Sequence, residues 1–224
     1  YYLRYDTSRA QGLNAPADSA ALSVNYGWTG RYFNSNTAPT RGYGIAVELG
    51  AGVTLRPERN PFTRTLVRWQ SFFPAGRVEA GDGAARSARI AVRTEVGAVL
   101  ARESAEIPVA QLFLTGGDTT VRGYGYRAIG ARTDNNQLYG GRYMGVASVE
   151  WQRPIVYGGN MTDWESTLFV DAGAVADRVG DLDPRVGVGT GVRWRSPVGP
   201  LQADLAWGVQ SKKLRLHLRL GFTF

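Results

Sequence analysis

Hydrophobic and polar residues alternate along most of the chain with a period of two. The pattern is clearest in the stretch LRLHLRLGFTF at 214–224, where every second residue is apolar: Leu214, Leu216, Leu218, Leu220, Phe222 and Phe224. Arginine, histidine, glycine and threonine lie between them. Side chains on a β-strand point alternately to opposite faces, so this stretch predicts a strand with one apolar and one polar, cationic face.

The same alternation recurs in about ten segments, and several are about ten residues long, enough to cross a hydrocarbon layer at a barrel tilt. Soluble strands more often stop near five or six residues. The predicted strands are 1–7, 21–28, 42–55, 63–72, 89–100, 143–155, 166–175, 186–196, 201–207 and 214–224. Their polar faces carry charge and glycine, and tyrosine and tryptophan recur near their ends, as in membrane-interface girdles. The pattern predicts an all-β, antiparallel transmembrane β-barrel, with residues 1–224 as one domain; a soluble β-sandwich is the alternative.

Composition agrees with this interpretation. The chain has 29 glycines, 11 tyrosines and 6 tryptophans but only 2 methionines and no cysteine. Many glycines and aromatics favour short strands and turns, and the lack of cysteine excludes disulfides and thiolate metal sites. No apolar run approaches the ~18 residues of a transmembrane helix. The net charge of +7 permits nucleic acid or an anionic membrane as partner, but the arginines are scattered at alternate strand positions, which favours a solvated barrel interior.

The alternation stops between about Ala101 and Gly141, a loop of roughly 40 residues, and connections of such length tend to be functional. Its centre reads GGDTTVRGYGYRAIG at 116–130, and these glycines and packing residues predict fixed turns. If the loop folds into the lumen, Arg122 needs a carboxylate, because a buried unpaired charge is costly. Glu150 and Asp171 lie on predicted interior faces of adjacent strands, and one guanidinium can bridge two carboxylates.

These residues also carry a family resemblance. VRGYGYRAIG, with the preceding FLTGGD, resembles the signature in the sixth extracellular loop of the outer-membrane assembly-factor superfamily that includes BamA and TamA. ASVEWQRPI, FVDAG and VRWRSPVGP resemble the strands that follow it, in their proper order. The spelling VRGYGYR and the run GVGTGVRWRSPVGPLQADLAW are most similar to TamA-like members. The resemblance is dense from about Arg89 to Phe224.

The resemblance implies specific site residues. The loop signature is Val121, Arg122, Gly123 and Tyr124, with Glu150 and Asp171 as lumen partners of the arginine. The outer-membrane targeting strand is Leu216, Leu218, Leu220, Phe222 and Phe224. The implied fold is a 16-stranded barrel preceded by periplasmic POTRA domains. This chain is then expected to be its C-terminal portion, beginning near the seventh strand, without POTRA domains and without the first-to-last-strand seam; a native ten-stranded barrel is the alternative.

The implied function is assistance to other β-barrel proteins, particularly autotransporters, as they insert into the bacterial outer membrane. The resemblance further implies outer-membrane lipid, client polypeptides and an inner-membrane-anchored TamB-like protein as partners. Two rival functions remain: a two-partner-secretion-type polypeptide pore and an anion-preferring porin whose arginines select anions.

Enzymatic chemistry has little support. The only histidine is His217, no GxSxG motif accompanies it, and we expect it to be a plain polar residue of a wet lumen. One histidine with scattered carboxylates makes a metal site improbable. GVGTG at 187–191 lies in a strand pattern and opens no helix, so its glycines are better explained as room for the folded-in loop. We therefore expect no catalytic residues, no cofactor, no metal and no nucleic-acid partner.

Overall fold

The computed structural model describes residues 1–8, 18–35, 38–132, 137–196 and 199–221. Ten strands form one sheet: β1 (Tyr2–Ser8), β2 (Ser19–Phe33), β3 (Gly42–Arg56), β4 (Pro61–Glu79), β5 (Ala85–Ala101), β8 (Tyr143–Tyr157), β9 (Asn160–Ala176), β10 (Arg185–Ser196), β11 (Gly199–Gly208) and β12 (Lys213–Leu220). The all-β prediction and all ten predicted strands are confirmed.

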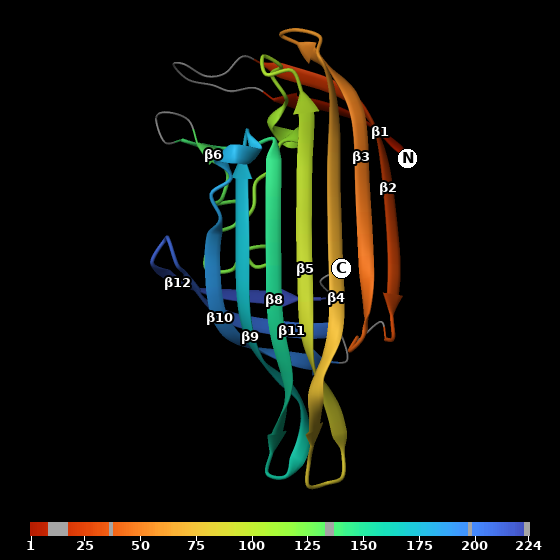
Figure 1. Cartoon of the computed structure of the whole chain (residues 1–224), viewed down its shortest axis with the longest axis vertical. Helices are drawn as coiled ribbons and strands as arrows, with labels where there is room; N and C mark the ends of the chain where they lie inside the picture. The colour runs from red at the N-terminus through yellow and green to blue at the C-terminus, as the bar shows by residue number, and fades with distance from the viewer. Residues whose placement is uncertain (9–17, 36–37, 133–136, 197–198, 222–224) are drawn as a thin grey trace.

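The sheet is antiparallel throughout and follows chain order, β1-β2-β3-β4-β5-β8-β9-β10-β11-β12 (Figure 1). Its only jump is from β5 to β8, across the long loop, which carries the short strands β6 (Ala131–Arg132) and β7 (Leu138–Tyr139). The sheet curves around this loop (Figure 1). Among the described residues, β1 and β12 are its two edge strands and do not pair with each other.

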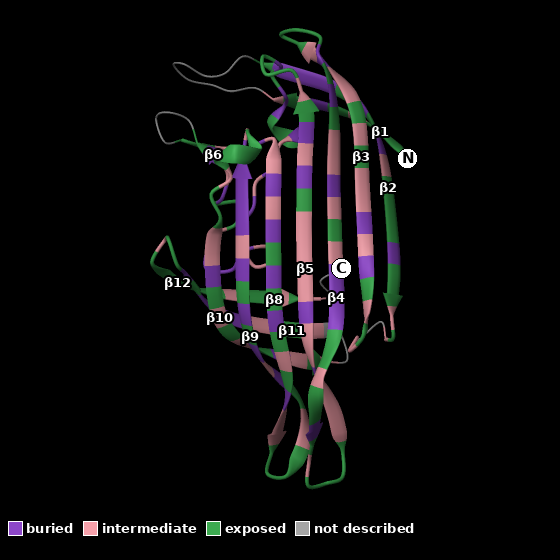
Figure 2. Ribbon diagram, viewed as in Figure 1, coloured by how far each residue is buried: buried purple, intermediate pink, exposed green. Residues whose placement is uncertain are grey.

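The two faces of the sheet differ as the alternation predicts, and Figure 2 shows exposed and buried bands along the strands. Large apolar side chains are exposed on the convex face, among them Leu3, Val149, Val170, Leu205 and Leu216. Polar side chains are buried on the concave face, among them Ser23, Asn25, Glu150, Asp171 and Asp204. Such a sheet matches lipid on one side and a polar interior on the other.

The apolar core lies inside the curve. Phe113, Val121, Tyr124 and Ile129 of the loop pack in one cluster with strand residues Leu66, Val99, Met144, Val146 and Val175. The loop thus supplies the apolar partner that this part of the concave face would otherwise lack.

Two hairpins are longer than the sequence pattern predicts. β4 continues to Glu79 and β5 already begins at Ala85, while β9 begins at Asn160. The pairing register shifts at Pro74/Arg77 in the first hairpin and at Pro154/Val156 in the second. A bulge changes the side-chain phase without ending the pairing, so the period of two fails there although the strands go on. Both hairpins project beyond the neighbouring turns at the bottom of Figure 1.

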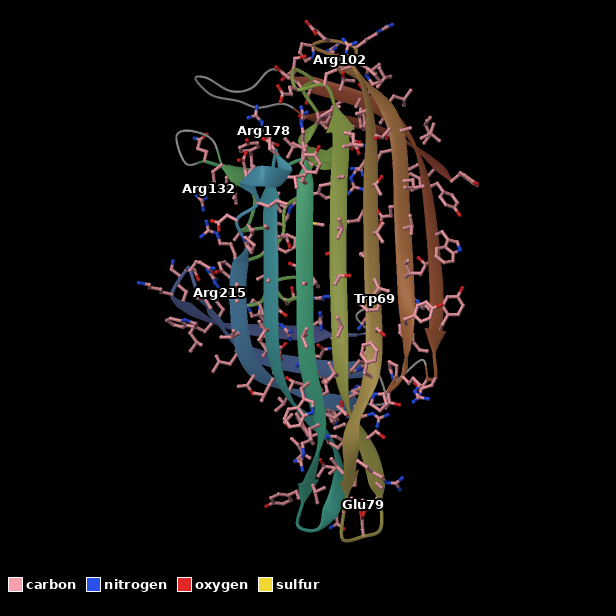
Figure 3. The ribbon with its side chains drawn as sticks, in the orientation of Figure 1. Trp69, Glu79, Arg102, Arg132, Arg178 and Arg215 are labelled. Carbon is pink, nitrogen blue, oxygen red and sulfur yellow. The ribbon has the colours of Figure 1, made fainter. Side chains whose placement is uncertain are left out.

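The molecule therefore has a loop end, where the long loop leaves β5, and a hairpin end. Figure 3 shows Glu79 at the hairpin end and Arg102 and Arg178 at the loop end, with Trp69 between them. In the described part of the chain, helical structure is limited to two 3-10 turns, η1 (Val109–Gln111) and η2 (Val179–Asp181). No described helix has the length and apolar character needed to cross a membrane.

Candidate functional site

The long loop folds into the lumen through a series of fixed turns. Phe113 forms an antiparallel bridge with Gly141, and Thr115 forms one with Ile129. Directly after Thr115 the backbone turns at Gly116, with φ of +105°, and at Gly117, with φ of +113°. These left-handed conformations are open to glycine and strained for most other residues. The GG pair therefore sets the turn that presents the signature to the sheet.

The signature lies on a floor of three glycines from neighbouring strands. A Cβ atom at Gly173 on β9 would lie 2.6 Å from Val121 Cγ2, and one at Gly208 on β11 would lie 2.6 Å from the Gly123 carbonyl oxygen. A Cβ atom at Gly187 on β10 would overlap the Arg122 carbonyl oxygen. The expectation that GVGTG leaves room for the loop holds at Gly187, whereas Gly173 and Gly208 were not foreseen.

Arg122 is bound by both carboxylates that the sequence assigned to it. Its Nε donates to Asp171 Oδ2 at 2.7 Å, its Nη2 donates to Asp171 Oδ1 at 2.9 Å, and its Nη1 donates to Glu150 Oε2 at 2.6 Å. The Arg122 backbone N–H also donates to Asp171 Oδ2, at 3.0 Å. The contact with Asp171 is a bidentate fork, the geometry in which arginine surpasses lysine.

A second arginine and a third carboxylate complete the cluster. Arg122 Nη1 also donates to Asp204 Oδ2 at 3.0 Å. Arg193 donates to Glu150 Oε2 at 2.8 Å and to Asp204 Oδ1 at 2.5 Å. Arg122, Glu150, Arg193 and Asp204 therefore form a closed ring of alternating charge on β8, β10, β11 and the loop. The alternation along β10 and β11 puts Arg193 and Asp204 on the polar face of the sheet, but alternation contains no sign that they meet Arg122.

The environment keeps Arg122 charged. Its side chain is only 3% exposed, and burial by itself would lower the pKa of a guanidinium. The hydrogen bonds that Arg122 donates to Asp171, together with the negative charges of Asp171, Glu150 and Asp204, outweigh this and raise the pKa of Arg122 above its usual range. The guanidinium carbon also lies 3.3 Å from the centre of the Phe169 ring, a close cation–π contact.

The two other signature residues bind the end of the sheet. The Gly123 N–H donates to His217 Nε2 on β12 at 3.0 Å, so this nitrogen carries no proton. The Tyr124 hydroxyl donates to Gln210 Oε1, between β11 and β12, at 2.6 Å. His217 is thus an acceptor for the signature backbone. Leu216, Leu218 and Leu220 of the predicted targeting strand lie exposed on β12, while Phe222 and Phe224 lie outside the described residues.

A chain of polar contacts leads from the ring to the hairpin end. Gln152 donates to Glu150 Oε1 at 2.7 Å and accepts from Arg89 Nε at 2.5 Å. Arg89 Nη2 donates to Glu165 Oε2 at 2.7 Å, and Arg86 Nη2 donates to Glu165 Oε1 at 2.5 Å. Glu165, whose side chain is 2% exposed, therefore joins the β4–β5 hairpin to the β8–β9 hairpin. No sequence pattern indicates this second cluster.

Comparison with known proteins decides the family. Residues 2–224, nearly the whole chain, match the model of the Omp85 superfamily domain. The chain belongs to the Omp85 superfamily. Omp85 membership and the barrel-type sheet place it in the bacterial outer membrane.

A solved structure has the same fold as this Omp85 chain. It is the crystal structure of BamA from Haemophilus ducreyi lacking POTRA domains 1-3, with a TM-score of 0.65 and 21% sequence identity. The similarity covers 91% of this chain and 42% of the BamA chain. This Omp85 chain thus spans less than half the length of the BamA that it matches.

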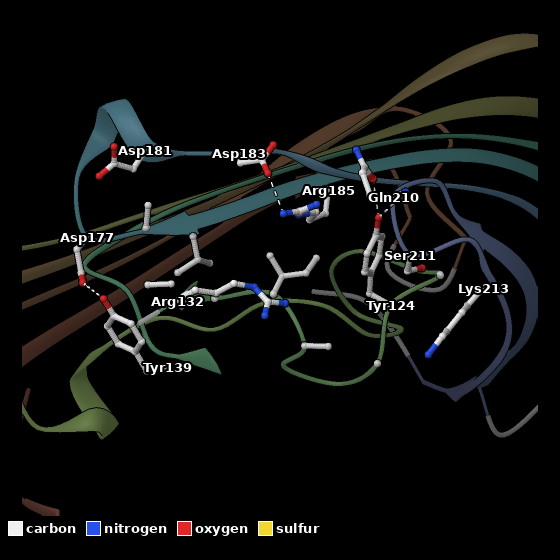
Figure 4. A pocket seen from close by; sticks show the side chains of 18 of the residues that line it. Tyr124, Arg132, Tyr139, Asp177, Asp181, Asp183, Arg185, Gln210, Ser211 and Lys213 are labelled. Atoms are coloured by element: carbon white, nitrogen blue, oxygen red, sulfur yellow. Dashed lines mark hydrogen bonds and ion pairs between the residues drawn. The ribbon is translucent and has the colours of Figure 1, made fainter. Parts of the chain in front are cut away.

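A cavity of about 800 Å³ lies beside the Omp85 signature and opens between the loop and the β9–β10 and β11–β12 connections (Figure 4). Its wall carries both Arg185, paired with Asp183 at 2.8 Å, and Asp177, hydrogen-bonded to Tyr139. Both signs of charge line it, so the cavity favours no one class of charged ligand. No group of three or more potential metal-binding side chains occurs among the described residues.

Proposed function

We propose that this Omp85 protein assists the insertion of other β-barrel proteins, autotransporters among them, into the bacterial outer membrane. The proposal includes no bond chemistry, no cofactor and no catalytic residue. Membership of the Omp85 superfamily and a fold shared with BamA support it. The resemblance of VRGYGYR to TamA-like members supports autotransporters as clients and a TamB-like inner-membrane-anchored protein as partner.

The main support for the proposal is that the long loop lies bound inside the lumen. The loop packs against the concave side of the sheet and is bound there by Arg122, at 3.0 Å or less, to carboxylates on β8, β9 and β11. A diffusion porin needs an open aqueous channel. A secretion pore needs a plug that leaves, and this loop is held by a buried network of charge-assisted hydrogen bonds.

The arginines of the lumen also argue against anion selection. Arg86 and Arg89 share Glu165, Arg64 and Arg68 share Glu48, and Arg122 and Arg193 share Glu150. Each of these guanidiniums is held in a directed contact with a carboxylate, so it is engaged in the structure rather than open to a passing anion. Their role is better explained as fixing the strands and the loop relative to each other.

The proposed mechanism uses backbone pairing and lipid. A poorly sealed strand edge of the barrel would template an incoming client strand by backbone pairing, and the client would add itself to the sheet. A thinned or distorted bilayer beside that edge would lower the barrier to insertion. The pinned loop would hold the sheet in the curvature that keeps this edge presented.

A reconstitution assay tests the proposal. The full-length protein is placed in liposomes, and the folding rate of an unfolded client barrel is compared with its rate in empty liposomes. We expect at least about tenfold faster folding, a lowering of the barrier by about 1.4 kcal/mol. Liposomes with an equal amount of an unrelated outer-membrane barrel control for general disturbance of the bilayer.

Single-channel recording in a planar bilayer distinguishes the alternatives. We expect little conductance from an insertase. Steady, anion-selective conductance without faster client folding would instead identify a porin, and conductance that appears only after the loop is released would identify a secretion pore. Either result would overturn the proposal.

A further inference from the structure

Two arginines of the inner face lie outside the arginine–carboxylate pairs of the lumen. Arg93 on β5 donates from Nη2 to the Thr120 carbonyl oxygen at 3.0 Å. Arg219 on β12 donates from Nη1 to the Asp118 carbonyl oxygen at 3.3 Å and from Nη2 to Gln202 Oε1 at 2.5 Å. In the described part of the chain neither guanidinium forms an ion pair with a carboxylate, so neutral oxygens alone hold these two charges.

Both arginines line one small cavity inside the curve of the sheet. Its volume is about 40 Å³, and its wall also includes Gln70 on β4 and Gln202 on β11. Side chains from β4, β5, β8, β11, β12 and the long loop meet around it. Because a single water molecule needs only about 10–15 Å³, the cavity has room for one small ion together with one or two waters.

Two buried polar atoms of this wall lack a hydrogen-bond partner in the protein. They are Arg219 Nε and Gln70 Oε1, and Gln70 as a whole is only 5% exposed. An unpaired buried donor costs free energy, so native proteins nearly always supply it with a partner. A half-turn of the Gln70 amide exchanges its oxygen and its NH2 group, so this side chain can donate as well as accept. Arg219 Nε can only donate, and its partner must therefore be an acceptor.

The charges around the cavity leave one positive charge without a buried counterpart. Four guanidiniums gather here, from Arg93, Arg122, Arg193 and Arg219. Three carboxylates are buried among them, from Glu150, Asp171 and Asp204. The other three arginines each act on Arg219 more strongly than Glu150 does. Arg219 thus lies in a positive environment despite the neighbouring carboxylates.

A fourth carboxylate, that of Asp118, also borders the cavity. Asp118 is partly exposed, and it lines a second cavity together with His217. Water weakens the field of a partly exposed charge, so Asp118 compensates the guanidiniums less than a buried carboxylate would.

We propose that this cavity is a binding site for one small inorganic anion, such as chloride, held between the guanidiniums of Arg93 and Arg219. An anion accepts hydrogen bonds and donates none, which matches Arg219 Nε and the amide groups of Gln70 and Gln202. Its charge supplies the missing counterpart, and a buried charge without one is costly. A single ion in so small a cavity is no conduction path, and the inference does not rest on the proposed function.

Nuclear magnetic resonance of chloride measures the binding, because the chloride line broadens when the ion exchanges with a protein site. The full-length protein is dissolved in an uncharged detergent, and chloride is titrated into a buffer whose other anion is gluconate. We expect saturable broadening in the parent. In Arg219→Gln the affinity should fall at least about tenfold, the factor expected when a hydrogen bond to a charged group is lost.

The matched control is Arg215→Gln. Arg215 lies two residues away on the same face of β12 and borders other cavities but not this one. Its chloride titration should stay that of the parent. An equal loss of affinity in Arg215→Gln would show that chloride responds only to the general positive charge of the lumen, and the proposed site would be wrong.

Gln70→Glu covers the case in which Arg219→Gln does not fold. A carboxylate at this position supplies the negative charge from within the chain, so the variant should fold without added chloride and should no longer broaden the chloride line. If Gln70→Glu still bound chloride as the parent does, the ion would lie elsewhere and the proposal would be overturned.

Bromide locates the ion. A crystal of the full-length protein grown in sodium bromide should show a peak of anomalous scattering between Arg93 and Arg219. Electron density without anomalous scattering at this position would show that water alone occupies the cavity, which would contradict an anion site.

Discussion

Gly187 on β10 lies directly beneath the carbonyl oxygen of Arg122, so close that a Cβ atom at this position would overlap that oxygen. The loop backbone and the strand backbone are therefore in contact without any side chain between them. This contact explains why a glycine stands in a strand, where it costs backbone entropy and packs nothing. It also sets the depth at which the Arg122 side chain enters the cluster of carboxylates.

Gly187→Ala should push the backbone of the loop at Arg122 away from β10. We expect a loss of about 1–3 kcal/mol in the free energy of unfolding, the usual cost of overpacking, together with faster hydrogen exchange at 120–124. Gly145→Ala on β8 is the matched control, because a Cβ atom there has nothing within 4 Å. Equal effects at the two positions would contradict the close contact at Gly187.

Arg122→Ala should leave Asp171, Glu150 and Asp204 without their shared partner. Removing one member of a buried ion pair costs about 3–5 kcal/mol, and we expect the loop to lose its protection in hydrogen exchange. Arg122→Lys keeps the charge but not the fork, so it should lie between the parent and Arg122→Ala. Parent-like exchange in Arg122→Ala would show that the loop does not depend on this residue.

His217 should matter through its acceptor nitrogen rather than through its polarity. His217→Phe removes the acceptor for the Gly123 N–H, whereas His217→Gln offers a carbonyl oxygen in its place. Amide exchange at Gly123, followed by nuclear magnetic resonance in micelles, should be faster in His217→Phe and near parental in His217→Gln. Parental exchange in both variants would show that the hydrogen bond contributes nothing to the loop.

Glu165→Gln should loosen the two long hairpins from each other. Arg86 and Arg89 would lose a buried, charge-assisted partner, a cost of roughly 1.5–3 kcal/mol, and exchange at 155–163 should rise. Glu79→Gln is the control, because its partner Arg77 is 72% exposed and exposed pairs contribute about 0–1 kcal/mol. If both variants raised hydrogen exchange equally, Glu165 would not be the residue that connects the two hairpins.

Much of the fold could be predicted from the sequence because alternate residues of each strand in a membrane barrel face lipid and lumen, which leaves a pattern with a period of two. The phase of β8 and β9 alone placed Glu150 and Asp171 inside, and the break in alternation located the loop. Where the phase shifts at the bulges near Pro74 and Pro154, the pattern ended before the strands did. Strand length beyond a bulge is set by backbone pairing, which leaves no periodic signal.

The contacts across the lumen could not be predicted in the same way. Alternation puts Arg193 and Asp204 on the interior face, but their partnership with Arg122 depends on the curvature of the sheet and on the path of a loop without periodicity. Alternation gives the face of a residue, and only the three-dimensional path of the chain gives its partner.

A disulfide between the loop and β9 tests whether the signature loop is tucked against the inner face of the sheet. Val121→Cys with Gly173→Cys places the two thiols where a Cβ atom at Gly173 would be 2.6 Å from Val121 Cγ2, within reach of a disulfide. Val121→Cys with Val170→Cys, on the outer face of the same strand, is the control pair. We expect the first pair to oxidise readily in the membrane-embedded protein and the second pair to stay reduced. If both thiols of the first pair remained free and reacted with a water-soluble maleimide as exposed cysteines do, the loop would not lie against the inner face of β9.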